Sequence, residues 1–167
     1  ASLEHLELLG SAAINGSGNG LANRISGNAA ANVIDGAGGL DSLDGAEGGD
    51  IYLIGSTADH PQAEINDSGS SGSDELRFAS ATAGQILTVF AGDTGLETIT
   101  TGTGTAAAPV ITATTVLHVN AAAAPNALAI SGNNGTNSLT GSNAADTLIG
   151  NGGNDTLNGG AGNDTPT

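Results

Sequence analysis

The sequence predicts an all-β fold, a solenoid in which short strands stack into two parallel sheets, and three observations support this. Glycine recurs at nine-residue intervals in two blocks of the chain, and an aspartate or asparagine follows each of these glycines at a fixed distance. Aromatic residues make up only 2% of the chain, with no tryptophan and no methionine, so a thick layered core would lack its usual side chains. A solenoid needs only one thin apolar column for each turn.

Eight windows of nine residues contain the repeat, four in each block. Position 1 of every window is glycine: Gly18, Gly27, Gly36, Gly45, Gly132, Gly141, Gly150 and Gly159. Position 6 is always Asp or Asn: Asn23, Asn32, Asp41, Asp50, Asn137, Asp146, Asp155 and Asp164. Position 8 is Ile25, Ile34, Leu43, Tyr52, Leu139, Leu148 and Leu157, with Pro166 as the exception.

Each window divides into a turn and a strand. Positions 1 to 6 are rich in glycine, which supplies the positive-φ conformations that other residues resist. Positions 7 to 9 predict a very short strand whose central residue points inward, because side chains alternate between the two faces of a strand. One apolar side chain per nine residues suffices if successive strands stack in two sheets with the apolar column between them.

The chain between the blocks loses the strict period but keeps its strand signals, which predict three segments. These are a first block at 1–53, an irregular middle section at 54–130, and a second block at 131–167, truncated at its C-terminus. The middle section is interpreted as a continuation of the solenoid with longer turns, or as a small separate β-domain. Its predicted strands are Ile51–Ile54, Ala63–Ile65, Glu75–Phe78, Ile86–Phe90, Glu97–Thr101, Thr115–Val119 and Leu128–Ile130.

The charge balance points to a cation as the partner. Two basic residues stand against seventeen acidic ones, which excludes the basic surface of a nucleic-acid binder. The alternative is an acidic surface that only confers solubility. Cysteine is absent, so there are no disulfides and no thiol ligands. No apolar run is long enough for a membrane span, and the start at Ala1, without Met, indicates an excised fragment.

The geometry of stacked turns favours calcium as this cation. Strands in a sheet lie about 4.8 Å apart, so the position-6 side chains of two turns stacked on the same side face each other at about that distance. Two calcium–oxygen bonds of about 2.4 Å span the gap. Without metal, two such carboxylates repel by roughly 3 kcal/mol at an effective dielectric of 20. An oxygen-only site suits calcium better than zinc or copper.

The windows resemble the G-G-x-G-x-D-x-U-x nonapeptide of the repeats-in-toxin (hemolysin-type) family. GGAGND at 159–164 and GNGGND at 150–155 are the nearest copies, and the resemblance covers residues 18–53 and 132–167. It implies a right-handed parallel β-roll in which two nonapeptides complete one turn and calcium lies between turns i and i+18. The motif ISGN at 25–28 also recurs at 130–133, which suggests tandem copies within a longer parent chain.

Carried over to this chain, the resemblance assigns candidate metal ligands. Asp146 and Asp164 form the pair expected to bind best, with backbone carbonyls from Gly141, Asn143, Gly160 and Gly162. Three mixed pairs should bind more weakly, because asparagine keeps the oxygen but loses the charge: Asn23 with Asp41, Asn32 with Asp50, and Asn137 with Asp155. The alternative is a metal-free ladder of turns held by Asn and Asp hydrogen bonds.

These features predict a calcium-binding module without enzymatic activity. The family resemblance adds a secreted or cell-surface bacterial protein, exported by type I secretion and folded by calcium outside the cell. The alternatives are an adhesive or structural spacer of a surface-layer protein or adhesin, and the C-terminal secretion module of a hydrolase. No catalytic motif is present. His5, His60 and His118 are interpreted as surface or strand residues, and Asp74 and Glu75 as solvated carboxylates at a strand edge.

Overall fold

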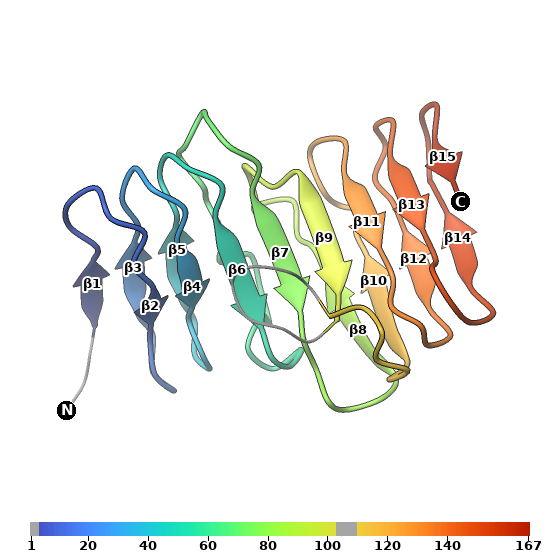
Figure 1. Ribbon diagram of the computed structural model, residues 1–167, viewed down its shortest axis with the longest axis horizontal. Helices are drawn as coiled ribbons and strands as arrows, with labels where there is room; N and C mark the ends of the chain where they lie inside the picture. The colour runs from blue at the N-terminus through green and yellow to red at the C-terminus, as the bar shows by residue number, and fades with distance from the viewer. Residues whose placement is uncertain (1–3, 103–109) are drawn as a thin grey trace.

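The computed structural model describes residues 4–102 and 110–167, which form one stack of short strands running from one terminus to the other (Figure 1). This part of the chain contains fifteen strands and no helix. The strands are β1 His5–Glu7, β2 Gly16–Ser17, β3 Arg24–Ser26, β4 Val33–Asp35, β5 Ser42–Asp44, β6 Ile51–Ile54, β7 Glu75–Phe78, β8 Gln85–Thr88, β9 Thr98–Thr101, β10 Leu117–Asn120, β11 Ala129–Ser131, β12 Ser138–Thr140, β13 Thr147–Ile149, β14 Thr156–Asn158 and β15 Thr165–Pro166.

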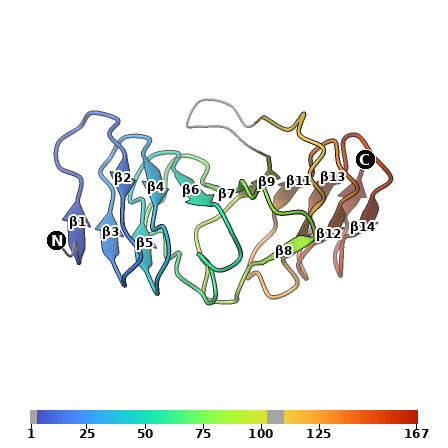
Figure 2. The same ribbon diagram turned by 90° about the horizontal axis from the view of Figure 1, so that it is seen from below.

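The strands form two layers, and every strand pairing is parallel. One layer is a continuous sheet of eight strands in the order β2-β4-β6-β7-β9-β11-β13-β15. The opposite layer consists of two sheets, β1-β3-β5 and β8-β10-β12-β14 (Figure 2). Isolated bridges from Leu43 to Ile65 and from Asn66 to Thr94 lie between these two sheets. The predicted all-β parallel solenoid is therefore confirmed.

In both blocks the strands start at position 7 of the windows, as the period predicts. Their register is eighteen residues: Ile25 pairs with Leu43, and Leu139 pairs with Leu157. Each strand places its position-8 side chain between the layers, where Ile25, Ile34 and Tyr52 have no exposed surface. The apolar core is thus a column with one residue from each strand, and few aromatic residues are needed to fill it.

The strands of the middle section join the same sheets. β7 pairs with β6 on one side and with β9 on the other. Observed and predicted strands agree within two residues at each end, with one exception. The segment Ala63–Ile65 forms only the isolated bridge at Ile65, because the N–H groups of Glu64 and Ile65 donate to the Asp93 carboxylate.

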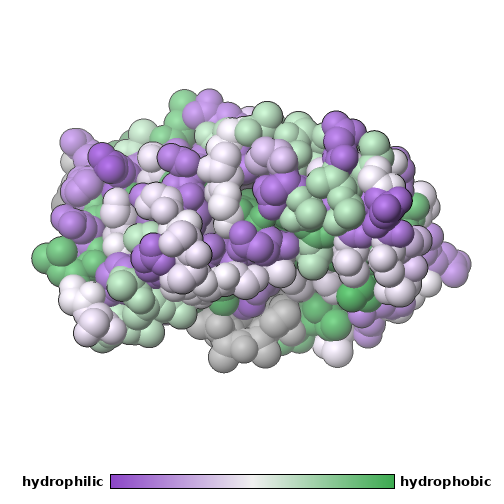
Figure 3. Space-filling model, turned by 90° about the horizontal axis from the view of Figure 1, so that it is seen from above, coloured by the Kyte–Doolittle hydropathy of each residue, from purple (hydrophilic) through white to green (hydrophobic). Residues whose placement is uncertain are grey.

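The face of the molecule seen in Figure 3 is mostly hydrophilic or near neutral in hydropathy, and apolar residues appear on it in small separate groups. Within the described residues, no helix has the length and apolar character needed to cross a bilayer. The apolar side chains are instead concentrated in the column between the layers.

The apolar column predicts that the stability lost on truncating a core side chain depends on how deeply that side chain is buried. Leu139 is fully buried, whereas Leu157, one rung further out, is only partly buried. We expect Leu139→Ala to lower the free energy of unfolding by about 2–5 kcal/mol and Leu157→Ala to lower it by less. Urea denaturation at one fixed calcium concentration measures both. Equal losses would contradict a core that thins toward the end of the stack.

Candidate metal sites

The position-6 side chains form a hydrogen-bonded ladder along the edges of the stack. In each pair predicted at i and i+18, the backbone N–H of the first residue donates to Oδ1 of the second. The donor–acceptor distances are 2.8 Å for Asn23 to Asp41, 2.7 Å for Asn32 to Asp50, 2.8 Å for Asn137 to Asp155, and 3.0 Å for Asp146 to Asp164. The structure therefore brings all four predicted pairs together.

The position-1 glycine provides the space that the position-6 side chain occupies. A Cβ atom on Gly36 or Gly45 would lie within 3.0 Å of the Oδ2 atom of Asp41 or Asp50 in the same window. A Cβ on Gly141 would lie 2.5 Å from Asp146 Oδ2 and 2.5 Å from the carbonyl oxygen of Gly159. None of these glycines has positive φ, so the requirement at position 1 is close approach rather than backbone conformation.

Four windows have closed turns, in which the position-2 N–H donates to the position-6 side chain of the same turn. They begin at Gly18, Gly27, Gly132 and Gly141, and each has Asn or Ser at position 2. In the window at Gly27, the Asn28 N–H donates to Asn32 Oδ1 at 2.9 Å, and Asn28 Oδ1 accepts the Ala30 N–H at 2.9 Å. The other three windows repeat both hydrogen bonds. Position 4 needs no glycine here, and Leu21, Ala30 and Ala144 occupy it.

The other four windows have open turns, in which the position-2 N–H no longer donates to position 6. Position 2 has positive φ in all four, at Ala37, Ala46, Asn151 and Gly160, and so does the position-4 glycine, at Gly39, Gly48, Gly153 and Gly162. The Ala37 and Ala46 N–H groups donate to Asp35 and Asp44 of the preceding strand instead. Position 6 is aspartate in every open turn, and every i and i+18 pair joins a closed turn to an open one.

Open turns leave carboxylate oxygens that lack a partner. Asp41 Oδ2 and Asp50 Oδ2 are buried and have no hydrogen-bond donor. Burial, above all, and the nearby Asp74, Asp67 and Asp44 raise the pKa of Asp50 to about 7, against the lowering effect of the Asn32 N–H. A buried, unpaired carboxylate oxygen is unfavourable without a cation. These oxygen-only sites therefore fit calcium, which takes carboxylate and carbonyl ligands.

The pair predicted to bind best, Asp146 with Asp164, has an aspartate in its closed turn, where the other three pairs have an asparagine. Both oxygens of Asp146 accept hydrogen bonds, from the Leu128 N–H at 2.7 Å and from the Ser142 N–H at 2.6 Å. Asp164 belongs to an open turn, where its Oδ1 accepts the Asp146 N–H. The carbonyl ligands expected from Gly141, Asn143, Gly160 and Gly162 remain predictions.

The ladder continues into the middle section, which sequence reasoning missed. The Asp50 N–H donates to Asp74 Oδ1 at 2.7 Å, and the Asp74 N–H donates to Glu97 Oε2 at 2.8 Å. On the other edge, the Glu64 N–H donates to Asp93 Oδ1 at 3.0 Å. Asp74 is 5% exposed, so its interpretation as a solvated carboxylate is wrong. Its place directly before a predicted strand, like that of Asp50, was the available signal.

His60 is a buried cation rather than a surface or strand residue, so that expectation is also wrong. Its Nε2 lies 3.0 Å from Asp93 Oδ2, and its Nδ1 lies 3.4 Å from Glu64 Oε2, with all three side chains buried. Burial by itself lowers the pKa of His60, but the hydrogen bonds to Asp93 and Glu64 raise it to about 9. His60 is therefore protonated at neutral pH and neutralises acidic residues of the ladder.

The close contacts at the position-1 glycines predict that an added methyl group there is destabilising. Gly141→Ala would press a Cβ against Asp146 Oδ2 and a backbone carbonyl, and overpacking of this kind costs about 1–3 kcal/mol. Gly20→Ala is the control, because its Cβ meets nothing within 4 Å. Thermal unfolding at fixed calcium should show destabilisation only for Gly141→Ala. A similar small effect for both variants would contradict the role assigned to position 1.

The His60 ion pairs predict a pH dependence of stability. Because the folded-state pKa of about 9 exceeds the unfolded value, the stabilisation is complete below about pH 6.5 and is lost as pH rises through about 9. His60→Gln leaves two buried carboxylates without their cation, so we expect a loss of about 3–5 kcal/mol at pH 6. The loss should shrink toward pH 9.5 in urea denaturation. His5→Gln, at an exposed position, is the control, and a pH-independent loss would contradict the assignment.

Comparison with known proteins agrees with this geometry. The model of the RTX calcium-binding nonapeptide repeat matches four copies, at residues 17–52 and 131–166. No curated protein and no solved structure matches the chain significantly. The matched residues are the two blocks, in each of which two closed turns are followed by two open turns. These two blocks are similar to the RTX calcium-binding nonapeptide repeat, a structural repeat whose ligand is calcium.

Proposed function

We propose that the chain is a calcium-dependent folding module of a bacterial protein that leaves the cell by type I secretion and acts outside the cell or at its surface. The observation that carries this proposal is the buried, unpartnered Oδ2 atom of Asp41 and of Asp50 in open turns that match the family. We also infer that the module has no catalytic role of its own, because the family is a structural repeat.

Electrostatics and chain entropy support the coupling of folding to calcium. The chain has a formal net charge of −15, and folding brings its carboxylates together along two edges. Its 28 glycines also lose more conformational freedom on folding than other residues do. An ion that binds only the folded state favours folding by mass action. Extracellular calcium modules bind at about 10⁻⁴–10⁻³ M, so such a chain stays unfolded at low internal calcium.

The proposed calcium ligands centre on the open turns. Asp41, Asp50, Asp155 and Asp164 would supply the carboxylates, and the closed turn eighteen residues earlier would supply the facing side of each site. Residues 1–53 and 131–167 would then be the calcium-binding blocks, with 54–130 as an irregular continuation between them. The pairing of β7 with β6 and β9 supports a continuous stack.

A structural role for the same module is supported by its shape. The strands stack along one axis, and the two ends of the chain lie at opposite ends of the stack (Figure 1). Calcium would stiffen such a rod, which is what a spacer in an adhesin or surface-layer protein requires. This role is compatible with calcium-dependent folding and differs only in what the parent protein does.

The proposed function predicts a selective response to calcium. Calcium should raise the β-structure content and the melting temperature, and magnesium at equal concentration should do so much less, because it requires a tighter octahedral shell. Circular dichroism in chelator, calcium and magnesium measures both quantities. An unchanged spectrum and melting temperature on adding calcium would rule out calcium-coupled folding.

Two matched variants locate the effect in the open turns. Asp155→Asn and Asp146→Asn each remove one charge and keep an oxygen that can accept the ladder hydrogen bond. We expect Asp155→Asn to reduce the calcium-induced rise in melting temperature more, because both oxygens of Asp146 already accept hydrogen bonds. The reverse order would place the ligands in the closed turns.

A further inference from the structure

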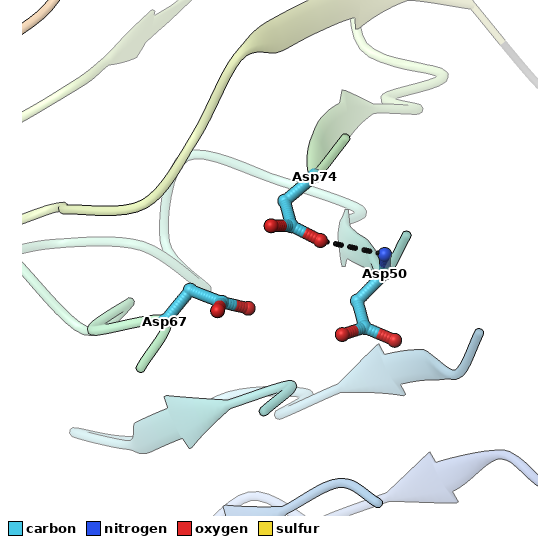
Figure 4. Close-up of side chains that lie close together, drawn as sticks. All are labelled: Asp50, Asp67 and Asp74. Atoms are coloured by element: carbon cyan, nitrogen blue, oxygen red, sulfur yellow. Dashed lines mark hydrogen bonds between the residues drawn. The ribbon is translucent and has the colours of Figure 1, made fainter. Parts of the chain in front are cut away.

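Three buried carboxylates meet where the first block joins the middle section. Asp50, Asp67 and Asp74 are 0%, 7% and 5% exposed, and one oxygen from each lies within 4.8 Å of the other two. Figure 4 shows the three side chains directed toward a common space. They come from the last open turn of the first block, from the loop after β6, and from the residue before β7.

Hydrogen bonds from backbone N–H groups and one hydroxyl fix each of these carboxylates. Asp50 Oδ1 accepts the Asn32 N–H, and Asp74 Oδ1 accepts the Asp50 N–H. Asp67 Oδ1 accepts the Gly69 N–H at 2.7 Å, and its Oδ2 accepts the Tyr52 hydroxyl. The positions of the three acids are therefore set by the backbone and by one buried phenol.

The loop that contains Asp67 is held over the open turn at Gly45. The Gly48 N–H donates to the Ser71 carbonyl at 3.1 Å. Ser68 donates to the Asp44 carboxylate through both its N–H and its hydroxyl. Asp67 is thus brought to Asp50 by a stacked turn that lacks the nonapeptide sequence.

The cluster has no cation of its own among residues 4–102 and 110–167. None of the ion pairs in this part of the chain includes its three acids. Arg77 is paired with Glu75, and His60 is paired with Glu64 and Asp93. Asp50 Oδ2 is buried without any hydrogen-bond donor. This unpartnered atom is an observation independent of the clustering, and it calls for a positively charged ligand.

We propose that Asp67 and Asp74 join Asp50, the last open-turn carboxylate of the first block, to form a calcium site that extends beyond the i and i+18 pattern of the nonapeptide blocks. Oxygens that share one calcium ion lie at most about 4.8 Å apart, because each bond is about 2.4 Å, and the three carboxylates meet this limit. The separations along the chain are 17 and 7 residues. Asp67 and Asp74 lie outside the residues that match the repeat family.

The chain contains a built-in probe for this site. Tyr52 is the only tyrosine, there is no tryptophan, and the Tyr52 hydroxyl donates to Asp67. Terbium(III) occupies oxygen-ligand calcium sites and emits when a nearby tyrosine is excited. We expect Tyr52-sensitised terbium emission from the 167-residue chain, and calcium should displace it. Asp67→Asn and Asp74→Asn should each raise the half-saturating terbium concentration about 10–100-fold, because a charged ligand is lost.

The control is Asp59→Asn, which removes one charge from the same section but contributes no atom to the cluster. It should leave the half-saturating concentration unchanged. Absence of sensitised emission, or emission unchanged in both Asp67→Asn and Asp74→Asn, would overturn the site. Failure of the nonapeptide sites would look different, because Asp155→Asn would leave the melting response to calcium unaltered while the Tyr52-sensitised emission remained sensitive to Asp67.

Discussion

The structure depends on one recurring interaction, a hydrogen bond from a backbone N–H to an acidic or amide side chain in the next turn of the stack. It occurs where the turn ends and the strand begins, so it supplies an acceptor to an N–H group that no strand partner reaches. In the blocks, the side chain of aspartate or asparagine is long enough to accept the N–H of the adjacent turn. In the longer turns of the middle section, glutamate takes over at Glu64 and Glu97. The position-1 glycine follows from this bond, because the accepting side chain lies where a Cβ would be.

This interaction places acids close together, and the chain neutralises them in different ways. In the blocks, an asparagine stands next to the aspartate in three of the four pairs, which halves the charge of each pair. On one edge of the middle section, His60 lies between Glu64 and Asp93 as a fixed internal cation. On the other edge, Asp50, Asp74 and Glu97 follow one another without an intervening amide, and Asp67 adds a further carboxylate. Burial, above all, together with Asp67 and Glu97 raises the pKa of Asp74 to about 6, against the lowering effect of the Asp50 N–H.

The nine-residue period was enough to predict the stack in the blocks. Because Ile25 and Leu139 stand at position 8, their burial could be predicted from the period, and the resemblance to the nonapeptide family added their pairing eighteen residues along the chain. The division into open and closed turns could not, since it depends on φ at Ala37 and Ala46, where glycine is absent. His60 and Asp67 were missed for another reason. The middle turns differ in length, so no fixed spacing relates these residues to the partners that they meet in the fold.

The division into closed and open turns separates two roles, stacking without an ion and presenting a carboxylate to one, which a single turn type would have to combine. In a closed turn the position-6 side chain accepts the position-2 N–H, so the turn can form without an ion and the next turn can stack on it. An open turn directs its position-2 N–H away and keeps a carboxylate oxygen without a donor, at the added cost of positive φ at Ala37 or Ala46. A bound cation would offset that cost and the buried charge. On the proposed function, calcium would therefore act on the open turns, while the hydrogen-bonded ladder, which is the same with aspartate or asparagine, sets the position of each carboxylate.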